Sequence, residues 1–337
     1  MICHPSEVLP APQAMRVTRF GDPPTVPTRS PGRRSVTKRA VVRVTHASVG
    51  ATDLTAIRGK YLLQPFPRFV PGYDLIGTIE HLGAGGHPRL SVGQRVAGIL
   101  PRMGAHATLL SVAPSLLVPV PDGLDSATAA TAPLDGVTAQ FALDALDTTH
   151  GPILVQGAGG AVGGWATQLA VARGLTVFGT ASPRTRQRAE ALGARVLDYR
   201  DPDWINALVE ATGGGVVGAI DHTGSRELHR AVSPQGRIVR IAFDGTHRHP
   251  QRATLAGFVS ATLRRHAHPS ERVCSIPLIV AARRAAYRNT LSAVLTDLTT
   301  GALLPPRVHE VRFEDYASAL TDAERCVPGS KAVLAMP

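Results

Sequence analysis

A regular alternation of short apolar strands with helices, from about residue 150 to residue 277, constrains the fold more than any other feature. Six segments have the short, apolar character of buried strands: Ile153–Val155, Thr176–Gly179, Arg195–Asp198, Val216–Asp221, Arg237–Ile241 and Arg272–Ile276. Helical segments at Trp165–Arg173 and Arg184–Leu192 separate the first three. Strands and helices at this spacing form a parallel sheet with right-handed crossovers. The sequence therefore predicts an α/β, doubly wound domain.

A glycine-rich turn follows the first of these strands. Gly157, Gly159, Gly160 and Gly163 lie where the strand ends and a helix begins. Glycine allows a tight turn and close approach of the backbone to a pyrophosphate, and the helix N-terminus adds unpaired N–H groups. Flexible loops also contain glycine, so a purely structural turn is the alternative. The flanking strand and helix, repeated along the chain, favour a dinucleotide-binding loop.

The end of the second strand indicates which nucleotide is bound. A site for NAD usually carries an acidic residue there for the ribose hydroxyls. This chain has no acid from Gly179 to Arg186, but it has Ser182, Arg184 and Arg186. A hydroxyl and guanidinium groups can bind a 2′-phosphate, which predicts NADPH as the cofactor. The alternative is that these arginines only cover a helix face.

The remainder of the chain has a different pattern of expected strands and helices. Strands are expected at Met15–Phe20, Ala40–Val49, Leu75–Leu82 and Arg95–Leu100, and helices at Ser126–Leu134 and Gly136–Leu146. Short strands without regular helices between them indicate a mostly antiparallel β domain. A long helix at Leu278–Leu298 and a strand at Ala332–Leu334 are expected to return the chain to this domain. We therefore predict two domains, residues 1–125 with 278–337, and residues 126–277.

Charge and cysteine content limit the partners. The formal net charge is +11, but the arginines are scattered and aromatic residues make up only 4% of the chain, which disfavours nucleic-acid binding. No apolar stretch is long enough to span a bilayer, and the N-terminal residues do not form a secretory signal. Three cysteines far apart predict neither a disulfide framework nor a zinc ribbon. We expect a cytosolic protein that contacts neither nucleic acid nor membranes.

Taken with the glycine loop, several short segments resemble the medium-chain dehydrogenase/reductase superfamily, in particular its zinc-independent quinone oxidoreductase and enoyl reductase branch. The resemblance runs from about Met15 to the C-terminus. The matching segments are Phe69–Gly77, Val92–Gly98, Val120–Leu124, Leu192–Ala194, Asp198–Arg200, Pro234–Arg237 and Gly329–Leu334. It implies a Rossmann domain joined to a GroES-like β domain, with the site between them.

The resemblance also bears on metal binding. Zinc-dependent members hold a catalytic metal with Cys, His and Cys, and the matching positions here are Gly50, Tyr73 and Leu134. None of these residues offers a thiolate or imidazole ligand. We therefore expect no metal. Without a Lewis acid, the acceptor of hydride from NADPH is expected to be a quinone or an α,β-unsaturated carbonyl compound, so the substrate is a small molecule.

Candidate catalytic residues follow from the same resemblance. Tyr61 matches a tyrosine near the substrate in many quinone reductases and is expected to donate a hydrogen bond, unless it is a surface residue on a loop. Tyr73 is expected to pack beside the cleft. Thr52 and His222 are further candidates, and His106 is expected at the cleft wall, although both histidines have a structural alternative.

The remaining expectations concern the cofactor and the type of reaction. The resemblance implies a cofactor site formed by Thr138, Gly157, Gly159, Gly160, Ala161, Val162, Ser182, Arg184, Arg186, Tyr199, Thr223, Phe243 and Arg325. A homodimer paired through Arg272–Ile276 is also implied. Gly50 replaces the usual Asn of the branch, which leaves two alternatives open: a redox-neutral cyclisation or isomerisation in secondary metabolism, and a non-catalytic NADPH-binding relative.

Overall fold

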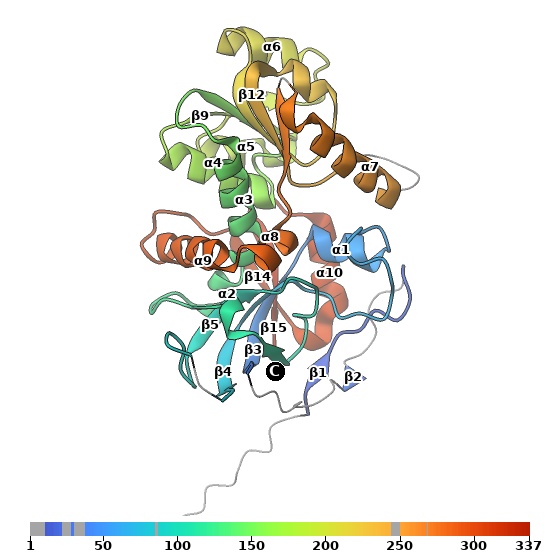
Figure 1. Cartoon of the computed structure of the whole chain (residues 1–337), viewed down its shortest axis with the longest axis vertical. Coiled ribbons are helices and arrows are strands. Elements are labelled where there is room, and N and C mark those ends of the chain that lie inside the picture. Colours follow the sequence, from blue (N-terminus) through green and yellow to red (C-terminus); the bar gives the residue numbers. More distant parts are fainter. Residues whose placement is uncertain (1–10, 22–27, 30–37, 85–86, 244–249, 268) are drawn as a thin grey trace, which may run out of the picture.

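The computed structural model describes residues 11–21, 28–29, 38–84, 87–243, 250–267 and 269–337. Two sheets lie in separate lobes along the long axis of the molecule, and α8 (Ile276–Ala282) and α9 (Arg284–Thr299) lie between them (Figure 1). None of the described helices combines the length and the apolar character that a bilayer crossing requires.

In the upper lobe, six parallel strands of the described chain form one sheet in the order β10-β9-β8-β11-β12-β13. Their bounds are β8 (Pro152–Val155), β9 (Thr176–Ala181), β10 (Arg195–Asp198), β11 (Val216–Asp221), β12 (Val232–Arg240) and β13 (Ser270–Val273). The order runs outward in both directions from the pair β8 and β11, which is the doubly wound arrangement predicted from the sequence. Ligands bind such sheets where the strand order reverses, beyond the carboxyl ends of these two strands.

Helices pack around this sheet and exclude water from it. They are α3 (Pro133–Leu146), α4 (Ala161–Ala172), α5 (Pro183–Ala191), α6 (Trp204–Thr212) and α7 (Pro250–Leu263). The side chains of β8 are fully buried from Ile153 to Val155, as expected for a central strand covered on both faces. Trp165 of α4 is also buried, so the strand before the glycine loop and the helix after it share one core.

In the lower lobe, the described strands form a sheet in the order β14-β15-β3-β4-β5-β7, and β6 also pairs with β3. Their bounds are β3 (Ala40–Val49), β4 (Asp74–Leu82), β5 (Arg95–Ile99), β6 (Leu109–Val112), β7 (Leu117–Pro119), β14 (Arg307–Arg312) and β15 (Ser330–Ala335). The pairing is antiparallel except between β14 and β15. The helices α1 (Ala51–Ile57), α2 (Ser126–Ala129) and α10 (Tyr316–Arg325) complete the lobe.

Three expectations about individual elements were wrong. The strand predicted at Met15–Phe20 is displaced: β1 (Gln13–Ala14) pairs with β2 (Thr28–Arg29), and Val17 forms only an isolated bridge. The helix predicted at Ser126–Leu134 ends at Ala129, because Pro133 begins α3 at a position where its missing N–H is not needed. The helix predicted at Leu278–Leu298 is two helices, since Arg283 leaves the helical conformation between α8 and α9.

Candidate functional site

The glycine loop joins β8 to α4 and needs glycine for steric reasons. Gly157 has a φ of +67°, a left-handed conformation that other residues rarely adopt. A Cβ atom on Gly159 would lie 2.3 Å from the carbonyl oxygen of Thr185, and one on Gly163 would lie 2.0 Å from the carbonyl oxygen of Gly157. The loop is therefore folded tightly against α4 and against the first turn of α5.

The loop after β11 lies beside the glycine loop, where the strand order reverses. The hydroxyl of Thr223 donates a hydrogen bond to Asp221 (2.8 Å), and its oxygen lies 3.2 Å from the side-chain oxygen of Gln156. The ring of His222 reaches Gly157, with its Cε1 atom 3.1 Å from the Cβ position of that glycine. Buried Arg240 donates to Asp221 over 2.6 Å and holds this loop in place. The structure therefore brings His222, Thr223 and the glycine loop together.

The residues predicted to bind a 2′-phosphate lie at the start of α5. Ser182 precedes the helix, and its hydroxyl lies 3.2 Å from that of Thr185. Arg184 donates to the carbonyl oxygen of Arg325 over 3.1 Å, which brings two predicted cofactor residues together. Arg186 donates to the carbonyl oxygen of Val196 in β10 over 3.5 Å and to Glu190 of its own helix over 3.4 Å. Tyr199 follows β10 and is exposed.

A narrow cavity lies between the glycine loop and the segment that leads into β15. Its lining includes Gly159, Gly160 and Thr185 from the upper lobe and Gly329 and Lys331 from the lower lobe. Arg188 of α5 also lines it. Neither cationic residue was singled out from the sequence. The signal for Lys331 was its position in the matching segment Gly329–Leu334, and the signal for Arg188 was its helical spacing of four residues from Arg184.

Lys331 takes part in a nearly buried ionic network that reaches the position of Gly50. Its ammonium donates to Asp135 of α3 over 2.6 Å, and it lies 3.0 Å from the Cβ position of Gly50. Burial alone would lower the pKa of this ammonium, but the negative charges of Asp135 and Asp74 outweigh burial and raise it. The chain thus places a cation where a side chain at residue 50 would otherwise lie.

Asp74 is fully buried beside this cation. It accepts hydrogen bonds from the backbone and hydroxyl of Ser48 and, over 3.3 Å, from the backbone N–H of Leu134. Burial raises the pKa of its carboxyl to about 7, although the charge of Lys331 opposes the shift. Asp74, which follows Tyr73, therefore connects the surroundings of Gly50 and Leu134 in one cluster of side chains.

Tyr61 and Tyr73 form a pair of phenols in the lower lobe. The hydroxyl of Tyr73 donates to the hydroxyl of Tyr61 over 3.2 Å, and the rings meet edge to face with their centroids 6.2 Å apart. Burial raises the pKa of the Tyr61 phenol to about 12, so the group stays protonated at neutral pH. Asp53 ties this region to Gly50 by accepting hydrogen bonds from the backbone N–H groups of Gly50 and Gly72.

The other predicted residues occupy varied positions. Thr52 is half-buried on α1, immediately after Gly50 and Ala51. Thr138 is buried on α3, and its hydroxyl donates to the carbonyl oxygen of Leu134 over 2.6 Å. Phe243 packs on two glycines, with its ring 3.1 Å from the Cβ position of Gly224 and 2.4 Å from that of Gly257 in α7.

The expectation that His106 lines the cleft was wrong. Its side chain is fully buried, and its two ring nitrogens lie 2.7 Å from the hydroxyl of Tyr316 and 3.0 Å from the carbonyl oxygen of Ser48. Its ring also fills the space of a Cβ atom on Gly72, which has a φ of +87°. His106 therefore has the structural role that was the alternative interpretation, and burial lowers its pKa.

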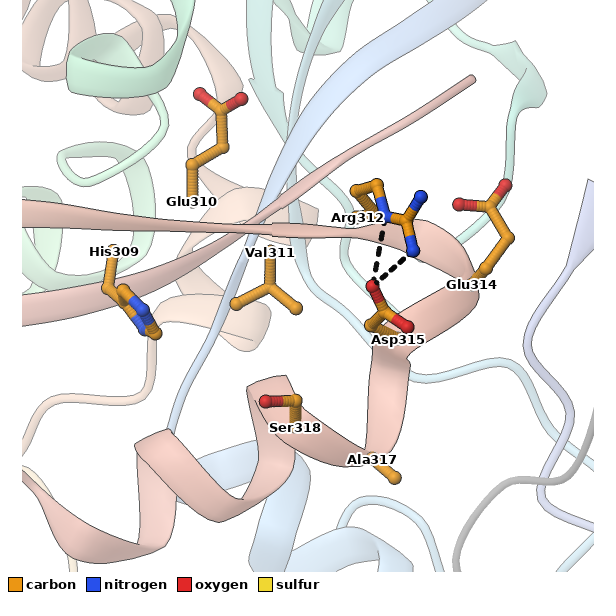
Figure 2. Close-up of a pocket in the computed structure, with 8 residues that line it drawn as sticks. All are labelled: His309, Glu310, Val311, Arg312, Glu314, Asp315, Ala317 and Ser318. Atoms are coloured by element: carbon orange, nitrogen blue, oxygen red, sulfur yellow. Dashed lines mark hydrogen bonds and ion pairs between the residues drawn. The ribbon is translucent and has the colours of Figure 1, made fainter.

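Two further features delimit the site. In the described part of the chain, no three His, Cys, Asp or Glu side chains are grouped as a metal site would require. A wider hollow of about 540 Å³ lies between β14 and α10, and Figure 2 shows its lining. Within this lining, Arg312 pairs with Asp315 at 3.0 Å. It contains none of the predicted site residues.

Comparison with known proteins identifies the two lobes. Residues 37–122 match the family model of the alcohol dehydrogenase GroES-like domain, and residues 161–266 match that of the zinc-binding dehydrogenases. A solved quinone oxidoreductase from Pseudomonas syringae pv. Tomato DC3000 superposes with a TM-score of 0.81 at 23% identity, covering 96% of this chain and 99% of that chain. At this identity the likeness shows the fold, which is the predicted Rossmann and GroES-like combination.

Curated relatives match shorter stretches. The trans-enoyl reductase himH of Aspergillus japonicus is 36% identical over 186 residues, which cover 50% of this chain and 54% of that protein. The quinone oxidoreductase of Pongo abelii is 27% identical over 256 residues, which cover 72% of this chain and 77% of that protein. The chain spans between 42% and 60% of the length of five of the curated relatives, himH among them.

Proposed function

Since this chain belongs to the medium-chain dehydrogenase/reductase superfamily, we propose that it is an NADPH-dependent reductase of quinones or α,β-unsaturated carbonyl compounds that works without zinc. The observation that carries the proposal is the tightly folded glycine loop at the reversal of strand order, facing Lys331 across a cavity. Relatives named trans-enoyl reductase, acrylyl-CoA reductase and quinone oxidoreductase support the reaction type.

The residues around the glycine loop fit a dinucleotide. Gly159 and Gly163 let the loop fold tightly against the backbone of Thr185 and Gly157, and the N-terminus of α4 presents N–H groups to an anion. Lys331 would add a positive charge, and Ser182 with Arg184 or Arg186 would bind a 2′-phosphate. His222, Thr223 and Phe243 follow β11 and β12, on the side of the sheet where the nicotinamide would lie. When bound, NADPH supplies the hydride.

The lower lobe would position the carbonyl group of the substrate. Tyr61 accepts a hydrogen bond from Tyr73, so its own proton is free to be donated to a carbonyl oxygen. Because burial raises the pKa of Tyr61 to about 12, this donor persists at neutral pH. We assign Tyr61 as the hydrogen-bond donor and propose Thr52 and His222 as further polar groups of the site. Zinc independence rests on Gly50, Tyr73 and Leu134, which offer neither the thiolate nor the imidazole ligands of a catalytic zinc.

The same proposal covers four properties of the whole protein. We propose domain boundaries near residues 125 and 277, a cytosolic location, a role in secondary metabolism and a homodimer. β13 supports the dimer because it is an edge strand of the upper sheet in the described chain, so its outer hydrogen-bonding groups can pair with a second copy.

The experiment is a spectrophotometric assay at 340 nm. Purified protein, NADPH and either 1,4-benzoquinone or a panel of enones should give steady NADPH oxidation, whereas product formation without net NADPH loss would instead support the redox-neutral alternative that Gly50 raises. Binding of NADPH without turnover of either kind would indicate a non-catalytic relative. Fluorescence titration should give tighter binding of NADPH than of NADH, and equal dissociation constants would contradict the assignment of Ser182, Arg184 and Arg186.

A further inference from the structure

Arg188 of α5 lies against the first turn of α4. Its Nη2 atom lies 3.4 Å from the Cβ position of Gly164, and its Nη1 atom lies 2.5 Å from that of Gly329. The guanidinium group therefore lies between the helix that follows the glycine loop and the segment that leads into β15. It lines the same cavity as Gly159, Gly160 and Lys331.

The charge of Arg188 is not balanced by the protein. Among the described residues, no carboxylate forms an ion pair with it, and its Nε atom is buried without a hydrogen-bond partner. Burial lowers the pKa of this guanidinium, which reflects the cost of removing it from water. Lys331, on the same cavity, is neutralised by Asp135. A partly buried cation without a counter-charge is destabilising, and an anion bound beside it offsets that effect.

We propose that Arg188 binds the diphosphate group of the dinucleotide, opposite the backbone N–H groups of the glycine loop. This assignment rests on the proposed function and adds a residue that specifies the diphosphate rather than the 2′-phosphate. The helix geometry separates the two roles. Arg186 faces β10 and Glu190, whereas Arg188 lies four residues from Arg184, on the side of the segment that includes Gly329.

The size of the cavity determines how Arg188 would bind a diphosphate. Its volume of about 40 Å³ holds a few water molecules and is smaller than a diphosphate requires. An arginine side chain is long and flexible, so its end can turn outward while the charge remains at the entrance. The planar guanidinium can then donate two parallel hydrogen bonds to phosphate oxygens, which the compact ammonium of Lys331 cannot do.

The test compares the variants Arg188→Met, Arg188→Lys and Arg186→Met in the full-length protein. Binding of NADH, NADPH, ADP and 2′-AMP is measured by fluorescence or calorimetric titration. Arg188→Met is expected to weaken NADH, NADPH and ADP to a similar extent, by roughly ten- to a hundred-fold, the size of a lost charged hydrogen bond. It should leave 2′-AMP unchanged. Arg188→Lys should recover part of the loss. Arg186→Met is the matched control and should weaken NADPH and 2′-AMP while leaving NADH and ADP unchanged.

Thermal unfolding without nucleotide provides a second readout. Removing an unbalanced, partly buried charge should leave the Tm of Arg188→Met equal to or above that of the wild type, whereas a purely structural arginine would lower it by several degrees. The inference is overturned by wild-type affinity of Arg188→Met for NADH, by a loss confined to NADPH and 2′-AMP, or by such a fall in Tm. Wild-type protein that binds none of the four probes would instead overturn the proposed function, and the inference with it.

Discussion

Two adjacent glycines of α4 provide a sharp test of the glycine loop. A Cβ atom at Gly163 would lie 2.0 Å from the carbonyl oxygen and 2.7 Å from the carbonyl carbon of Gly157, both backbone atoms. A Cβ atom at Gly164 would have its nearest neighbours at 3.4 Å, at the ends of the Arg188 and Leu192 side chains. Gly163→Ala therefore requires the loop to move by more than about 1 Å, because carbon and oxygen do not approach so closely. Gly164→Ala requires almost no movement.

The two variants share one energetic term and differ in another. Alanine in place of glycine within a helix stabilises the folded state by roughly 0.5–1 kcal/mol, and this gain applies at both positions. Overpacking costs about 1–3 kcal/mol and applies only at Gly163. Gly164→Ala should therefore be slightly stabilising. The difference in unfolding free energy between the two variants isolates the overpacking cost, about 1–3 kcal/mol.

Urea unfolding followed by tryptophan fluorescence measures this difference. The chain has two tryptophans, Trp165 on α4 and Trp204 on α6, so the signal reports on the upper lobe. With an m-value of about 1–3 kcal/mol/M, the unfolding midpoints of the two variants should differ by about 1 M. Gly163→Ala should also weaken NADPH binding, because the displaced segment is the proposed phosphate-binding loop. Equal midpoints for the two variants would refute the described packing of the loop on α4.

Three further predictions follow from the lower lobe. Tyr61→Phe should lower kcat for a quinone or enone by about 10²–10³, and Tyr73→Phe, which removes only the partner hydroxyl, by about ten-fold or less; equal losses in steady-state assays would contradict this order. The pKa of Asp74 is about 7 in the folded state, whereas the ordinary value of 3.8 applies in the unfolded state. Between these two pH values the folded state holds a proton that the unfolded state has released. The free energy of unfolding should therefore fall by roughly 4 kcal/mol as pH rises from about 4 to 7. Urea titrations of Asp74→Asn should show a much weaker pH dependence, and an unchanged slope would exclude Asp74 as its source. Lys331→Met leaves Asp135 buried without its partner and should cost about 3–5 kcal/mol by the same method, so a loss below 1 kcal/mol would show that the pair is solvated.

The sheet of the upper lobe was predictable because its signal is local. Buried parallel strands are short apolar runs, and the predicted bounds of β10 and β11 match the structure, as do those of β3 in the lower lobe. The glycine loop was also recognisable from its neighbours in sequence. The break at Arg283 was not, because no proline or glycine marks it and the change of direction is imposed by the packing of α8 and α9 between the lobes.

The charged part of the site depends on contacts between distant segments. Lys331 meets Asp135 across 196 positions of sequence, and His106 meets Tyr316 across 210. No pattern within either segment specifies such a partner. The sequence placed His106 near the cleft by family position, whereas the structure shows that its two ring nitrogens already have partners within the lobe. The position of Arg188 was predictable in part. Helical spacing places it on a different side of α5 from Arg186, but the spacing does not show which side of α5 faces the glycine loop.

Gly50 and Lys331 are close neighbours, and their contact bears on the question of hydride transfer. Considered alone, Gly50 removes a side chain that the related reductases use, which raised doubt about hydride transfer. In the structure the Lys331 ammonium, which Asp135 holds, lies 3.0 Å from where a Cβ atom of residue 50 would be, so a larger residue there would require this flexible end of the side chain to shift by a few tenths of an ångström. The ion pair and the glycine therefore fit closely together, and a polar donor remains beside the proposed site, supplied by β15 instead of the start of α1.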